Sequence, residues 1–72
     1  MIRFNLRGEY IELNKLLKAA GVCESGGAAN QAIAAGLVKV DGQTETRKGG
    51  KIRAGRQVEF DGKVIQIEES GV

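Results

Sequence analysis

Histidine is absent from the 72-residue sequence, and cysteine occurs once, at Cys23. Without histidine the chain has no Ser–His or Cys–His nucleophile pair and lacks the most common metal ligand. A single cysteine cannot form an internal disulfide bond or build a zinc site with other cysteines. We therefore expect a protein that is not an enzyme and that holds no metal or other cofactor.

Long apolar runs are also missing from the sequence. No stretch approaches the ~20 apolar residues of a membrane span, and "MIRFNLRGEY" at the N-terminus lacks the apolar run of a signal peptide. We therefore expect a cytoplasmic protein without membrane contact. The apolar content of 42% with three aromatic residues suits a small aliphatic core, and the length predicts one domain over residues 1–72.

Two helices are predicted in the first half of the chain. In 11–21 the apolar residues recur at i, i+3, i+4 and i+7, which places them on one helical face, and Gly21 can end the helix in the left-handed conformation. In 25–36, Ser25 is a typical N-cap, and the helix closes at Gly36. The predicted core positions of the two helices are Leu13, Leu16, Leu17, Ala20, Ala29, Ala32 and Ile33.

Apolar residues alternate with a period of two after the second helix. Two Asp-Gly pairs, 41–42 and 61–62, each follow a short alternating run and predict tight turns between strands. The second turn would place Val58 opposite Ile65. Alternation over 2–6 predicts an N-terminal strand in the same sheet. The sequence therefore predicts an α+β fold with two packed helices against a small, mainly antiparallel sheet.

Basic residues are concentrated in the segment 39–56. This segment carries six basic and two acidic side chains, a net charge of +4, whereas 1–38 has a net charge of +1 and 57–72 a net charge of −3. A nucleic-acid surface would have this local excess of positive charge. Lysine and arginine on exposed strands also protect sheet edges, and the total charge of +2 is small for a nucleic-acid-binding protein. From the residues alone, both interpretations stay open.

Four motifs follow one another in the order and spacing of a known RNA-binding domain. "ELNKLLKAAGV", "SGGAANQAIAAG", "LVKVDG" and "KIRAGRQV" resemble the domain of ribosomal protein S4, the αL motif, over 11–67. The length and first strand look most like the small free-standing bacterial proteins of the YbcJ type. Members of the family bind structured RNA in a ribosomal protein, pseudouridine synthases and tyrosyl-tRNA synthetases, and the domain has no catalytic activity of its own. The resemblance implies structured ribosomal or transfer RNA as the partner, with binding on the ribosome one form of it, and we expect a monomer.

The two helices supply the first candidate RNA contacts. The resemblance implies that Lys15 and Lys18 contact phosphates. The first turn of the second helix, with Ser25, Gly26 and Gly27, presents unpaired backbone N–H groups that can bind an anion. An ordinary serine N-cap explains the same residues equally well.

The basic segment supplies the other candidate contacts. Gly49 and Gly50 predict a flexible loop tip that would let Arg47, Lys48 and Lys51 adjust to an irregular phosphate backbone. With so few aromatic residues, the chain lacks the stacking platform of a single-strand binder, which favours structured RNA. The complete set of expected RNA contacts is Lys15, Lys18, Ser25, Gly26, Gly27, Lys39, Arg47, Lys48, Lys51 and Arg53.

Four residues depart from the family pattern. Glu12 stands where the family commonly has arginine, Asn14 where it has an acidic residue, Gly26 where it has arginine, and Arg56 where it has aspartate. These departures bear on which RNA features the protein would recognise. The alternative function is a protein-interaction adaptor that docks an acidic partner through 39–56.

Overall fold

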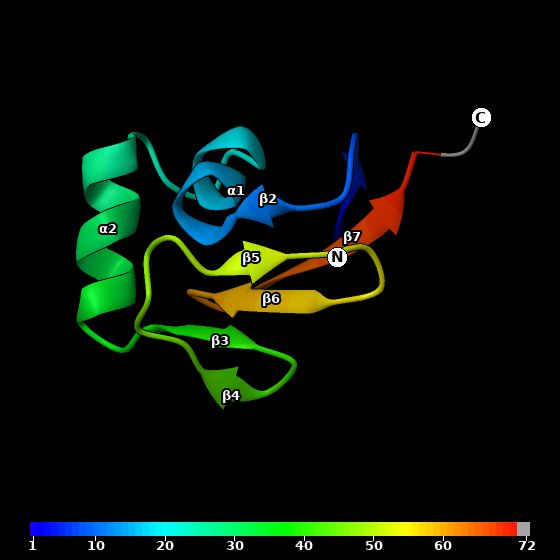
Figure 1. Ribbon diagram of the computed structural model, residues 1–72. Helices are drawn as coiled ribbons and strands as arrows, with labels where there is room; N and C mark the ends of the chain where they lie inside the picture. Colours follow the sequence, from blue (N-terminus) through cyan, green and yellow to red (C-terminus); the bar gives the residue numbers. More distant parts are fainter. Residues whose placement is uncertain (71–72) are drawn as a thin grey trace.

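The computed structural model describes residues 1–70 as two helices and seven strands in a mixed α+β fold. In the view of Figure 1, α2 lies to the left of the strands and α1 lies at the top, beside β2. Neither helix within the described residues is long and apolar enough to span a membrane. In chain order the elements are β1 (Ile2–Leu6), β2 (Ile11–Glu12), α1 (Leu13–Ala19), α2 (Gly26–Ala34), β3 (Val38–Val40), β4 (Gln43–Thr44), β5 (Lys51–Ile52), β6 (Gln57–Phe60) and β7 (Lys63–Glu69).

The main sheet has five strands in the order β1-β7-β6-β3-β4. Strand β1 runs parallel to β7, and the other neighbours are antiparallel. Val58 lies opposite Ile65, as predicted. Asp61 and Gly62 both have positive φ values, 54° and 74°, which is the backbone of the two-residue turn that Asp-Gly favours. The predicted α+β fold, with its N-terminal strand and mainly antiparallel sheet, is confirmed.

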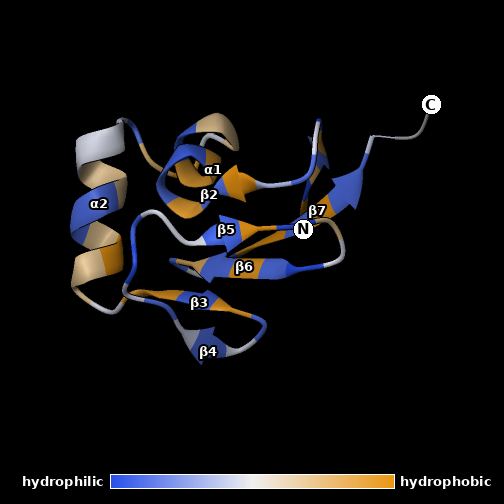
Figure 2. Cartoon of the chain, viewed as in Figure 1, coloured by the Kyte–Doolittle hydropathy of each residue, from blue (hydrophilic) through white to orange (hydrophobic). Residues whose placement is uncertain are grey.

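The core lies between the helices and the main sheet. The three leucines of α1 are fully buried and pack with the small face of α2 and the inward residues of the strands. Figure 2 shows the matching alternation of hydrophobic and hydrophilic residues along the strands. The predicted N-cap is also present, because Ser25 Oγ accepts a hydrogen bond from the backbone N–H of Ala28 at 3.1 Å. The buried core residues are Leu6, Leu13, Leu16, Leu17, Ala29, Ala32, Ile33, Val38, Ile52, Val58, Ile65 and Ile67.

The segment around Gly49 and Gly50 corrects one prediction. The backbone N–H of Leu13 donates to the carbonyl of Gly50 at 2.8 Å, and that of Asn14 donates to the carbonyl of Lys48 at 3.1 Å. The first N–H groups of a helix need acceptors from outside the helix, and Glu12 at the N-cap position of α1 provides no side-chain acceptor. The predicted flexible tip is therefore wrong, since this loop caps α1 with its backbone.

Strands β2 and β5 form a second, two-stranded sheet that the sequence did not predict. They pair antiparallel, with Ile11 opposite Ile52 and Glu12 opposite Lys51. Ile52 is buried, and Ile11 packs against the core. This small sheet therefore holds β5, which directly follows the capping loop, beside β2 and the start of α1.

Candidate nucleic-acid interface

The capping loop and the small sheet bring lysines from two distant parts of the chain together. Lys48 uses its carbonyl to cap α1, so its backbone is fixed while the residue is exposed. Lys51 is held opposite Glu12 by the pairing of β2 and β5. The Glu12 carboxylate also forms an ion pair with Lys15, one turn into α1, at 2.9 Å. Backbone geometry thus sets Lys15, Lys48 and Lys51 around the start of one helix.

Arginines that precede and follow β5 in the sequence extend this group of cations. Arg47, Lys51 and Arg56 line one hollow of about 250 Å³, together with the acidic Glu45 and mostly polar neighbours. Arg47, Lys51 and Glu45 line a second hollow of about 560 Å³ beside the glycines of the capping loop. Arg53 follows Lys51 on the same side of the extended chain. We call the resulting group the cationic surface; it consists of Lys15, Arg47, Lys48, Lys51, Arg53 and Arg56.

Three cations of this surface are paired with carboxylates. The pairs are exposed, so they contribute little to the stability of the fold, but they orient the cations. Within residues 1–70 they are also the only ion pairs, and Lys48, Lys51 and Arg53 have no acidic partner there. The three pairs are Glu12–Lys15 at 2.9 Å, Glu45–Arg47 at 3.2 Å and Asp41–Arg56 at 2.8 Å.

Members of the ion pairs have shifted pKa values. Hydrogen bonding to Arg47 lowers the pKa of the Glu45 carboxyl. The side chain of Arg56, followed by the backbone N–H of Gln57, lowers the pKa of Asp41. A hydrogen bond to Glu12 raises the pKa of Lys15. Glu45, Asp41 and Lys15 are therefore charged at neutral pH.

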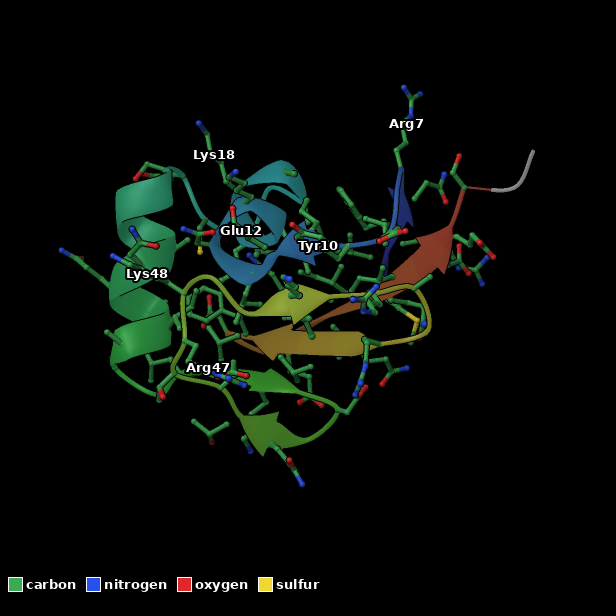
Figure 3. The ribbon with its side chains drawn as sticks, viewed as in Figure 1. Arg7, Tyr10, Glu12, Lys18, Arg47 and Lys48 are labelled. Atoms are coloured by element: carbon green, nitrogen blue, oxygen red, sulfur yellow. The ribbon has the colours of Figure 1, made fainter. Side chains whose placement is uncertain are left out.

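Tyr10 is an aromatic member of this region that sequence reasoning missed. It is 41% exposed, with Lys51 Nζ 4.9 Å and Arg53 Cζ 5.8 Å from the centre of its ring. Arg53 also donates a hydrogen bond to the carbonyl of Glu9 at 3.4 Å. The sequence signal was weak, because Tyr10 directly precedes a strand of two residues. In Figure 3, Tyr10 and Glu12 lie between Arg7 on one side and Lys18, Lys48 and Arg47 on the other.

The remaining expected contacts lie elsewhere in the fold. Lys18 is exposed one turn beyond Lys15, on the last turn of α1. Lys39 occupies the middle of β3, between Thr44 and Glu59 in the register of the main sheet. Ser25, Gly26 and Gly27 begin α2, where the serine hydroxyl is used as the cap. Within residues 1–70, no hydrogen bond or ion pair connects this turn to the cationic surface.

Besides Glu12, which pairs with Lys15, two of the departures from the family pattern have structural partners. The Asn14 amide donates to Asn30 Oδ1 at 3.0 Å and joins α1 to α2 in a partly buried position. Arg56, which sequence reasoning noted only as a departure, pairs with Asp41 in the β3–β4 turn and lines the polar hollow. A basic residue outside the family pattern thus becomes part of the cationic surface.

Residues 4–68 match the S4 domain, so the match covers nearly all of the described chain. The chain belongs to the S4 domain family. It is 50% identical over 68 residues to YbcJ of Escherichia coli strain K12, with 93% of this chain and 97% of that protein covered. It is also 43% identical over 61 residues to a tyrosine–tRNA ligase of Ralstonia nicotianae, covering 85% of this chain and 16% of the ligase.

A solved structure of a family member has the same fold. The solution structure of E. coli YbcJ superposes with a TM-score of 0.74 at 49% identity, covering 94% of this S4-domain chain and 87% of YbcJ. That structure is described as revealing an αL motif involved in RNA binding. The predicted family and the predicted αL fold are both confirmed.

Proposed function

We propose that this S4-domain protein is a non-catalytic, cytoplasmic RNA-binding protein that recognises structured ribosomal or transfer RNA, on or off the ribosome, through its cationic surface. The observation that carries the proposal is the assembly of six cations from two distant parts of the chain, Lys15 and 47–56, beside the start of α1 and the adjoining polar hollow. The RNA-binding description of YbcJ, which shares half of its residues with this chain, supports the same function.

The fixed backbone of the capping loop is better suited to binding a folded RNA than to binding a flexible, single-stranded RNA. Folded RNA is recognised mainly through phosphates, 2′-hydroxyl groups and shape, which requires cations at set spacings. Lys48 and Lys51 are held by backbone hydrogen bonds and strand pairing, so only their side chains need to be ordered on binding. This reduces the entropy that binding costs.

Lys48→Ala tests the proposal with little risk to the fold. The substitution removes an exposed charge and keeps the carbonyl that accepts from Asn14. Each phosphate contact contributes a slope of about −0.7 to −0.9 to a log–log plot of affinity against salt. With a base-paired RNA hairpin as the probe, we expect the slope for Lys48→Ala to be shallower by about one unit.

Lys63→Ala is the matched control. Lys63 is equally exposed but lies opposite Phe60 at the β6–β7 turn, outside the cationic surface. Its substitution should leave the slope unchanged. Equal effects at Lys48 and Lys63, or no salt-dependent affinity for the hairpin in the wild-type protein, would refute the proposal. Polyglutamate binding as tightly as the hairpin would instead favour an adaptor for acidic proteins.

A further inference from the structure

The exposed side of the small sheet carries a distinct set of side chains. Side chains alternate between the two faces of a strand, and Ile52 faces the core on β5. Its neighbours Lys51 and Arg53 are therefore on the outer face, and both lie over the ring of Tyr10. This face combines an exposed aromatic ring with two cations that have no acidic partner within residues 1–70.

A hollow of about 340 Å³ opens next to the Tyr10 ring. Phe4, Leu6 and Ile11 are its apolar lining residues, and Asn5 and Arg7 are its polar ones. Its lining contains no carboxylate, so a phosphate next to it meets no repelling charge there.

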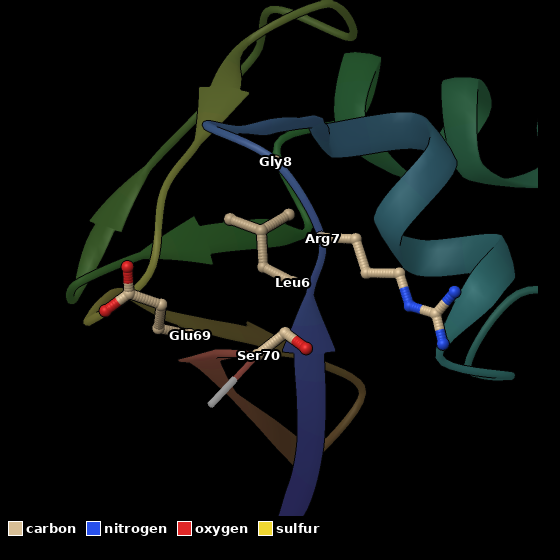
Figure 4. Close-up of a pocket in the computed structure, with 5 residues that line it drawn as sticks. All are labelled: Leu6, Arg7, Gly8, Glu69 and Ser70. Atoms are coloured by element: carbon tan, nitrogen blue, oxygen red, sulfur yellow. The ribbon is translucent and has the colours of Figure 1, made fainter. Parts of the chain in front are cut away.

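The neighbouring hollow does not share these properties. It has a volume of about 430 Å³ and lies where β1 and β7 end, with Glu69 and Ser70 among its lining residues. Figure 4 shows the Arg7 side chain pointing away from Glu69 and Ser70. Arg7 lines both hollows, but only the Tyr10 hollow combines it with an exposed aromatic residue and has no carboxylate in its lining.

We propose that Tyr10 and its hollow bind a single unpaired nucleotide of the RNA. The base stacks on the Tyr10 ring, and the flanking phosphates pair with Lys51 and Arg53. This inference rests on the proposed RNA-binding function and specifies the feature that is recognised, a base-paired stem interrupted by an unpaired base. It also departs from the expectation that the chain lacks a stacking platform, which rested on the small number of aromatic residues.

The composition of the chain provides a direct reporter. Tyr10 is the only tyrosine and tryptophan is absent, so intrinsic fluorescence excited in the tyrosine band comes from this one ring. The probes are three RNA hairpins of the same stem, one with a bulged adenosine, one with an abasic nucleotide at the bulge and one fully paired. We expect the bulged adenosine to quench Tyr10 and to bind roughly 5- to 150-fold more tightly than the abasic hairpin, the range for stacking one base on an aromatic side chain.

Variants at Tyr10 separate stacking from folding. Tyr10→Phe should retain the preference for the bulged adenosine, whereas Tyr10→Leu should bind all three hairpins with the affinity of the fully paired one. Equal affinities of the wild-type protein for the three hairpins, with no quenching of Tyr10, would overturn the inference and leave the proposed RNA binding intact. Absence of salt-dependent binding to every hairpin would instead overturn the proposed function and the inference together.

Discussion

In the proposed RNA complex, the Glu45 carboxylate opposes phosphate binding by one cation of the surface. Its carboxylate accepts hydrogen bonds from the backbone N–H of Arg47 at 3.0 Å, from Nε at 3.2 Å and from Nη2 at 3.3 Å. Both side chains line the two hollows that also contain Lys51. Because pairing lowers the pKa of Glu45 and raises that of Arg47, both stay charged at neutral pH. A phosphate must therefore compete with Glu45 for the Arg47 guanidinium.

The substitution Glu45→Gln should strengthen RNA binding. The glutamine amide oxygen can still accept from Arg47, so the local backbone is preserved, but the net charge of 39–56 rises from +4 to +5, with six basic residues and one acidic residue. One additional phosphate contact steepens the log–log salt slope by about 0.7–0.9. If the variant and the wild-type protein bind equally well at 1 M salt, this steeper slope makes the variant bind about five- to eightfold more tightly at 0.1 M salt.

Fluorescence anisotropy of a labelled RNA hairpin, titrated between about 50 and 200 mM salt, measures this change over the range in which phosphate contacts dominate. Glu59→Gln is the control, because it changes the net charge equally but lies on β6, opposite Lys39. An unchanged slope for Glu45→Gln would refute the idea that Glu45 restrains Arg47. Equal gains from the two variants would show that total charge, and not position, determines affinity.

Two further predictions concern stability. Ser25→Ala should lower the free energy of unfolding by about 1 kcal/mol in urea titrations, because the hydroxyl caps α2 by accepting from the Ala28 N–H. Reduced RNA affinity of the folded variant would indicate that Ser25 also binds an anion. Unchanged affinity would limit its role to capping. Asp41 has a lowered pKa in the folded state, so its stabilising effect is complete above the unfolded pKa of about 4 and is lost as the pH falls through the folded value. Asp41→Asn, which the left-handed turn tolerates, should therefore lose less stability on acidification than the wild-type protein, and identical pH profiles would contradict the role of the Arg56 pair.

The elements with strong local signals were predictable from the sequence. Helix α1 repeats leucine at helical spacing, and the β6–β7 hairpin has alternating residues around an Asp-Gly turn. The pairing of β2 with β5 had no such signal. Each strand has two residues, and the Ile11–Glu12 strand also fits the start of the helical pattern. About 40 residues separate the partners, so only tertiary packing brings them together.

The candidate site was predictable in part. The family resemblance implied Lys15, and the basic segment indicated Arg47, Lys48 and Lys51. The fold gathers all four on one surface, and their contact with RNA stays a prediction. Tyr10 was missed, because its neighbours Lys51 and Arg53 come close only through the unpredicted pairing of β2 and β5.

The low net charge of the chain is compatible with a surface that binds a polyanion such as RNA, because of where the acidic side chains lie. Glu12, Asp41 and Glu45 are each paired with a cation of the surface, so they fix the positions of Lys15, Arg56 and Arg47 while cancelling much of their long-range field. Lys48, Lys51 and Arg53, which have no acidic partner within the described residues, are left to supply the net attraction. Such an arrangement weakens non-specific attraction to any phosphate backbone, since fewer counterions are released. In the proposed complex, discrimination would therefore come from the fixed spacing of the cations and from the exposed ring of Tyr10, on which a base that is paired within a regular duplex cannot stack.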